Sequence, residues 1–163
     1  MGRLSTMHLS YRHTYQGSTD AVVSLMANAD FITDVAEHSG ATSHTVRIEG
    51  ATTHMEMALE APSDVAKFVG KTIHVTQRLA WGPADSQGVR RGTVDFGVAG
   101  MPVNVSAAAV LTPTGPDSCV GTYDGDLNVR IPLVGKKVET LVAPSINDAF
   151  AGLERRADEW LSR

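Results

Sequence analysis

Six histidines are the residues of this sequence best suited to chemistry near neutral pH, as metal ligands or as acid–base groups. They are His8, His13, His38, His44, His54 and His74. The chain has no HExxH motif, no CxxC motif and no two histidines four residues apart on a predicted helix. A single cysteine cannot complete a structural zinc site. We therefore expect no metal and no other cofactor.

Nucleophilic or acid–base catalysis has equally little support in the sequence. Cys119 has no neighbour that would activate its thiol, and no GxSxG motif is present. His54 shares a predicted strand face with Glu56, but we expect that face to be exposed. His13 falls on a predicted inner face, yet no inward carboxylate is evident to pair with it. We assign no catalytic residue, and these patterns favour a binding protein over an enzyme.

The longest element that could position functional side chains is a helix predicted from Gly135 to Ser162. Its apolar residues recur every three or four positions and so share one stripe: Val138, Leu141, Val142, Ile146, Ala149, Phe150, Leu153, Ala157, Trp160 and Leu161. At about 1.5 Å per residue the helix is roughly 40 Å long, so a core must wrap along it. Pro144 is predicted to kink this helix rather than divide it, because Ala143 is a poor N-cap.

Alternating apolar and polar residues predict about seven strands. Their ranges are Thr6 to Tyr15, Ser43 to Glu49, Thr52 to Glu60, Ile73 to Trp81, Thr93 to Val98, Val103 to Leu111 and Cys119 to Ile131. Two short helices should follow the first strand, one capped by Ser18 or Thr19 and the other capped by Asp30 and stopped by Gly40. Residues 61–70 are interpreted as a single helical turn or a loop.

Length and composition limit the functional classes. We interpret residues 1–163 as one domain. A net charge of -4 and the lack of a basic stripe argue against nucleic acid as a partner. The lone cysteine fits a reducing compartment, and no long apolar run or signal-peptide core is present. We therefore expect a cytoplasmic protein without stable membrane insertion, as a monomer or a weak homodimer.

The second half of the chain resembles a known family. The residues that carry the likeness are GMPVNVSAAAVLTPTGPDSC and YDGDLNVRIPLVGKKVE, of which IPLVGKKVE is the most specific piece. The element order is similar to the helix-grip fold of START-like (SRPBCC) proteins, which include birch-pollen-allergen proteins and polyketide cyclases. The closer likeness is to the actinobacterial domain-of-unknown-function family number 2505. The resemblance implies an α+β fold, in which a curved antiparallel sheet wraps around the long C-terminal helix and encloses a cavity for hydrophobic or amphipathic small molecules.

The cavity implied by the resemblance defines our predicted ligand-binding residues. They are His13, Met55, Met57, Gln77, Trp81, Phe96, Tyr123, Leu127, Ile146 and Phe150, and Leu59, Leu79 and Val105 also face inward. We expect a pocket of roughly 300 to 1,000 Å³ with Gln77 and Tyr123 as polar anchors. Gly125 should leave room on the inner face, so Gly125→Leu is predicted to displace ligand without harming the fold.

Three functions stay open. The first is a non-enzymatic carrier of a hydrophobic, lipid-like small molecule. The second is a small cyclase- or hydrolase-like enzyme that uses His13, Gln77 and Tyr123 in the same cavity. The third is a protein-interaction domain with a packed core and no cavity.

Overall fold

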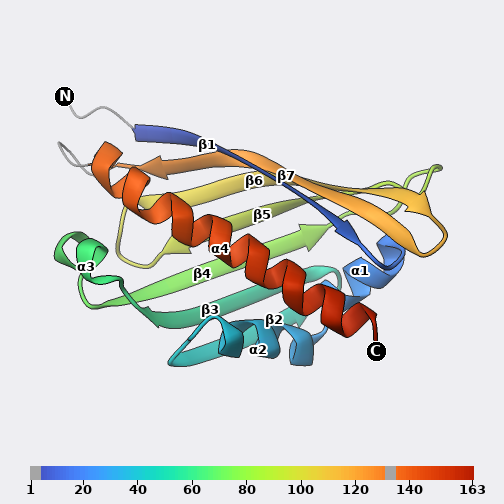
Figure 1. Cartoon of the computed structure of the whole chain (residues 1–163), viewed down its shortest axis with the longest axis horizontal. Helices are drawn as coiled ribbons and strands as arrows, with labels where there is room; N and C mark the ends of the chain where they lie inside the picture. The colour runs from blue at the N-terminus through green and yellow to red at the C-terminus, as the bar shows by residue number, and fades with distance from the viewer. Residues whose placement is uncertain (1–4, 131–134) are drawn as a thin grey trace.

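The computed structural model describes residues 5–130 and 135–163 as a sheet covered on one face by helices (Figure 1). The strands are β1 (Ser5–Tyr15), β2 (Ser43–Glu49), β3 (Thr52–Glu60), β4 (Thr72–Trp81), β5 (Arg90–Val98), β6 (Val103–Gly115) and β7 (Ser118–Val129). They form one 7-stranded sheet in the order β1-β7-β6-β5-β4-β3-β2, and all neighbours are antiparallel. The predicted end of the last strand at Ile131 lies outside the described residues.

The helices of the described residues are α1 (Thr19–Met26), α2 (Ala29–His38), α3 (Ser63–Val69) and α4 (Gly135–Leu161). The last of these, α4, runs diagonally across the sheet as one helix that includes Pro144, as predicted (Figure 1). Of these described helices, none is both long and apolar enough to cross a membrane. The predicted α+β helix-grip arrangement is therefore confirmed.

Some predicted boundaries need correction. The helix α2 begins at Ala29 and is capped by Asn28 rather than by Asp30. The Asn28 side-chain oxygen accepts hydrogen bonds from the backbone N–H groups of Asp30 and Phe31. Ser18 caps α1, which is one of the two residues predicted.

The region predicted as a single turn or a loop is the seven-residue helix α3. In addition, β5 begins three residues earlier than predicted and β6 extends to Gly115. Glycine and proline next to the predicted strand ends are typical turn signals, but the strand pairing continues past them.

Side-chain alternation decides which face of the sheet is covered. Along β7, Tyr123 and Leu127 are buried whereas Asp124 and Asp126 are exposed. Across β3 to β7, residues directly opposite one another form one row on the covered face: Met55, Gln77, Phe96, Val105 and Leu127. Burying this face against α4 supplies the apolar core, to which α4 contributes Val138, Phe150 and Ala157.

Asp34 of α2 forms hydrogen bonds with the C-terminal half of α4. One carboxylate oxygen of Asp34, Oδ2, accepts from Arg156 Nε at 2.7 Å and from Trp160 Nε1 at 2.8 Å. The Trp160 ring also meets Phe31 edge-on, with centroids 5.6 Å apart. Burial alone would raise the pKa of Asp34, but these charge-assisted hydrogen bonds outweigh it and lower that pKa.

Gly125 does not provide room for a ligand, and that prediction is wrong. Gly125 lies between Ala107 of β6 and Leu9 of β1. A Cβ atom at this position would overlap the backbone carbonyl oxygen of Ser106 and the Ala107 Cα. Because the obstacle is backbone of the neighbouring strand, Gly125→Leu would disrupt the sheet itself.

We expect Gly125→Ala to lower the free energy of unfolding by more than about 3 kcal/mol, the upper end of overpacking costs. Gly152→Ala is the matched control. Its Cβ would meet nothing closer than Arg155 Nη2 at 3.8 Å, so it should stabilise α4 by about 0.5–1 kcal/mol. Chemical denaturation measures both changes. Equal stability of the two variants would contradict the close approach of β6 and β7.

The Asp34 contact predicts a dependence of stability on pH. Because the pKa of Asp34 is lowered by folding, its contribution is complete above the unfolded carboxyl pKa, about 3.9, and is lost as the pH falls through the folded value. Asp34→Asn should lower the free energy of unfolding by about 1.5–3 kcal/mol at pH 7. The difference in stability between wild type and this variant should shrink below about pH 4. Denaturant titrations from pH 7 to pH 2 test this, and a gap that is constant with pH would refute it.

Candidate functional site

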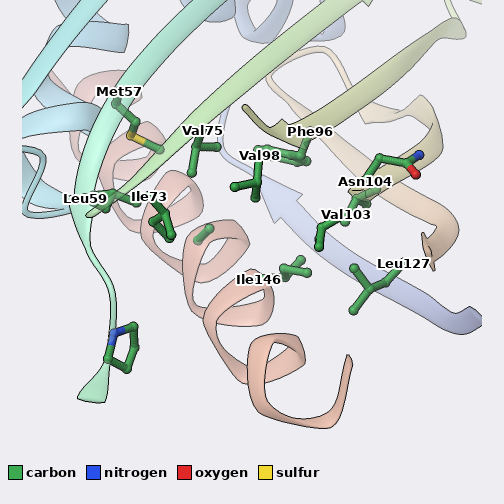
Figure 2. A pocket seen from close by; sticks show the side chains of 14 residues that line it. Met57, Leu59, Ile73, Val75, Phe96, Val98, Val103, Asn104, Leu127 and Ile146 are labelled. Atoms are coloured by element: carbon green, nitrogen blue, oxygen red, sulfur yellow. The ribbon is translucent and has the colours of Figure 1, made fainter. Parts of the chain in front are cut away.

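A pocket of about 160 Å³ lies between the covered face of the sheet and α4. Figure 2 shows Val75, Phe96 and Leu127 on the sheet side and Ile146 on the helix side of this pocket. The other described lining residues are Met57, Leu59, Pro62, Ile73, Gly97, Val98, Val103, Asn104, Val105 and Ala149. Among the described lining residues Asn104 has the one polar side chain, so this part of the pocket wall is apolar and offers few hydrogen-bonding groups.

The pocket exists because α4 covers the sheet unevenly. The helix packs on β1 and β7 and then passes over α2, while α3 touches it near its other end (Figure 1). Val105 and Leu127 are buried, whereas Ile73, Val75 and other lining residues toward β4 are only half-buried. Pro62 and Ala149 are exposed, so the pocket reaches the surface beside them.

The structure places the ten predicted ligand-binding residues in different surroundings. Four line the pocket: Met57, Phe96, Leu127 and Ile146. Met55 and Trp81 are buried in the core, and Gln77 is half-buried on the covered face without lining this pocket. Tyr123 and Phe150 border a separate void of about 10 Å³, and His13 is bound to α4. The pocket is therefore smaller than the expected 300 to 1,000 Å³, and neither of the two expected polar anchors, Gln77 and Tyr123, lines it.

The sequence prediction missed several lining residues on β4, β5 and β6: Ile73, Val75, Val98 and Val103. The alternation that placed Gln77 and Leu79 inward continues in phase to Ile73 and Val75, so the signal was present. Which end of each strand remains uncovered depends on the path of α4, and no local pattern specifies it.

A half-buried polar cluster joins β1 to the C-terminal half of α4. His13 Nδ1 lies 2.9 Å from Glu154 Oε2, and His13 Nε2 lies 3.1 Å from Asp158 Oδ1. The prediction that no inward carboxylate pairs with His13 is therefore wrong. Glu154 follows Phe150 by four residues and so shares its helix face, which is the signal that could have revealed it.

Both ring nitrogens of His13 face carboxylate oxygens, so the imidazole lies between Glu154 and Asp158. Burial and, to a lesser degree, Asp158 raise the pKa of Glu154, against the opposing effects of Tyr11 and His13.

Three tyrosines lie near the cluster, and the lone cysteine is buried opposite one of them, Tyr15. Burial and the nearby Glu154 carboxylate raise the pKa of Tyr11 to about 12. The hydroxyls of Tyr15 and Tyr123 hydrogen-bond to each other at 2.8 Å, and burial raises the pKa of Tyr123 to about 12. Burial raises the pKa of Cys119 to about 11, so its thiol is a poor nucleophile. In the described part of the chain, no group of three His, Cys, Asp or Glu side chains is arranged to hold a metal ion.

The Phe150 ring lies between the apolar pocket and the small void. Its ring stacks on Tyr11 with centroids 5.4 Å apart, contacts Tyr123 at 5.3 Å and meets Phe96 edge-on at 5.9 Å. Phe96 lines the pocket, whereas Tyr11 and Tyr123 border the small void. One buried ring on α4 therefore forms the wall between the two spaces.

Solved structures with the same architecture identify the class of fold. An aromatase/cyclase, ZhuI of Streptomyces sp. R1128, has a TM-score of 0.68 at 14% identity and covers 98% of this chain and 95% of its own. Norcoclaurine synthase of Thalictrum flavum, in complex with dopamine and hydroxybenzaldehyde, has a TM-score of 0.60 at 17% identity over 98% and 89%. A START superfamily protein of Mycobacterium smegmatis has a TM-score of 0.57 at 14% identity over 94% and 98%. These likenesses show the fold alone, which is START-like.

The family follows from the sequence. Residues 10–161 match the family described as protein of unknown function (DUF2505), and the chain belongs to that family. An uncharacterized protein of Mycobacterium tuberculosis is 26% identical over 117 residues, which are 71% of this chain. The match spans 66% of that relative's own length.

Because the Phe150 ring is 5% exposed and contacts three aromatic rings, Phe150→Ala should lower the free energy of unfolding by about 3–5 kcal/mol. Phe150→Leu, which keeps most of the apolar volume, should cost less than half as much. Denaturant unfolding measures both variants. A loss below about 1 kcal/mol for Phe150→Ala would show that this face of α4 is not packed as described.

Proposed function

We propose that this protein is a non-enzymatic binding or carrier protein for a hydrophobic or amphipathic, lipid-like small molecule. The observation that carries the proposal is the apolar pocket between the sheet and α4, which reaches the surface beside Pro62 and Ala149. The START-like fold adds support, since one structural neighbour is described in complex with two small aromatic molecules. The proposed ligand-binding residues are Met57, Val75, Phe96, Leu127 and Ile146.

The pocket volume constrains the ligand. About 160 Å³ is below the typical 300–1,000 Å³ of small-molecule sites and close to the 150 Å³ of an apolar cavity that accepts benzene. The pocket therefore suits one aromatic ring or a short branched alkyl segment. A longer ligand would extend outward past Pro62 and Ala149.

An enzyme that uses the same cavity is the second candidate. The His13–Glu154–Asp158 cluster supplies the acid–base groups that such an enzyme needs. However, none of these three residues lines the apolar pocket. The Phe150 ring lies between Phe96 of the pocket and Tyr11, which neighbours Glu154. We therefore rank binding above catalysis. The third possibility, an interaction domain with a packed core, does not account for the pocket.

Filling the pocket should abolish binding without unfolding the protein. Val75→Phe adds a ring on the lining wall, and we expect the affinity for the neutral fluorescent probe N-phenyl-1-naphthylamine to fall at least tenfold. His74→Phe is the matched control, because the adjacent residue of β4 is exposed on the opposite face. Fluorescence titration measures both affinities, and native mass spectrometry of the purified wild type shows any co-purifying molecule.

If the wild type binds neither this probe nor other apolar aromatic or fatty-acid probes, the carrier function is excluded. The interaction-domain alternative then takes its place. If both variants lose binding equally, the probe binds elsewhere than in this pocket.

A further inference from the structure

The apolar pocket and the small void follow one another along the same elements. On β6, Val103 and Val105 line the pocket, whereas Val105 and Ala107 border the void (Figure 2). On α4, Ile146 lines the pocket, and Phe150 borders the void one helical turn later. The void of about 10 Å³ therefore lies beyond the inner end of the pocket, between the same sheet face and the same helix.

The Phe150 ring fills the space between the pocket and the void. Its side chain is 5% exposed. The ring meets Phe96 of the pocket with centroids 5.9 Å apart, and it contacts Tyr11 at 5.4 Å and Tyr123 at 5.3 Å, both of which border the void. Three aromatic contacts thus hold one ring across the inner end of the pocket.

The space behind this ring offers no partner to a polar ligand group. The Tyr11 hydroxyl is hydrogen-bonded to Glu154, and the Tyr123 hydroxyl is hydrogen-bonded to that of Tyr15 at 2.8 Å. The described walls of the pocket and of the void are apolar. A polar group at this end would lose its water without gaining a hydrogen bond, so the inner end of a bound molecule is apolar.

We propose that Phe150 sets the length of the apolar part that a ligand can bury. The ligand enters with its apolar end first, stops against the Phe150 ring and keeps its polar group in water beside Pro62 and Ala149, where the pocket reaches the surface. This inference rests on the proposed carrier function. It adds the chemical class of the ligand, which is an amphipathic molecule with a short, unsubstituted apolar end and a polar group at the other end.

A series of straight-chain alcohols from 1-butanol to 1-decanol tests the proposal, because its members differ only in the length of the apolar part. Each affinity is measured by displacement of N-phenyl-1-naphthylamine. In the wild type the affinity should rise about fourfold for each methylene group that becomes buried, and it should stop rising once the chain end meets Phe150. In Phe150→Ala this break should move to an alcohol longer by about two carbon atoms or more, because the ring removed is larger than two methylene groups.

Two variants serve as matched controls. Phe150→Leu keeps most of the apolar volume at the inner end, so its break should stay close to that of the wild type. Leu111→Ala removes a fully buried side chain that is not among the described residues bordering either space. It should lower stability and leave the break unchanged.

The outcomes separate this inference from the proposed function. If neither N-phenyl-1-naphthylamine nor any alcohol binds, the carrier function itself fails. If the probe binds but no alcohol displaces it, or if the affinity of the wild type rises over the whole series without a break, the depth limit is overturned and the carrier function stands.

The variants decide whether Phe150 is the residue responsible. A break at the same alcohol in wild type and Phe150→Ala overturns the assignment to Phe150, and so does an equal shift in Leu111→Ala. If Phe150→Ala does not fold, Phe150→Val replaces it, because this variant retains part of the buried volume. An unchanged break in Phe150→Val then contradicts the proposal.

Discussion

The width of one helix is the constraint on which the rest of this structure depends. Seven strands spaced about 4.8 Å apart make a sheet roughly 29 Å wide, whereas a helix with its side chains is about 10–12 Å across. The helix α4 alone therefore cannot cover the apolar face of the sheet, and it takes a diagonal path (Figure 1). The short helices α1, α2 and α3 cover part of what remains. The apolar pocket lies where these described elements cover the face incompletely.

The two halves of α4 have different neighbours. Its C-terminal half is fixed by Asp34 with Arg156 and Trp160, and by His13 with Glu154, so directed polar contacts set its position there. Toward its N-terminal half the contacts to the sheet and to α3 surround an apolar pocket. Directed hydrogen bonds fix a register more strictly than apolar packing does. The polar contacts of Asp34 and His13 therefore set the register of the C-terminal half of α4 against α2 and β1.

The sequence predicts the helices and strands well because the spacing of apolar residues within each element has the period of that element. Alternation located all seven strands, and the three-to-four-residue spacing located α4 as one helix through Pro144. The errors arise where a contact distant in sequence decides the outcome. The role of Gly125 depends on Ser106 in the neighbouring strand.

In the candidate site, too, local patterns are predictable from the sequence whereas contacts between distant segments are not. Half-burial of Val75 depends on the path of a helix that begins 60 residues later, which no local pattern contains. Glu154 is the instructive exception. Its position on the apolar stripe, four residues after Phe150, was visible in the sequence, but its partner His13 comes from the other end of the chain. A polar residue in phase with an apolar stripe predicts a buried partner, even when the partner cannot be identified.

The presence of Glu154 at the seam between sheet and helix calls for a reason other than stability. Removing a carboxylate from water costs several kcal/mol, and the contacts of Glu154 with His13 and with the Tyr11 hydroxyl act against this cost. An apolar side chain that packed against Tyr11 and Phe150 would serve the core at least as well. The contact between His13 and Glu154 is therefore best understood as a directional one, which sets where β1 meets α4.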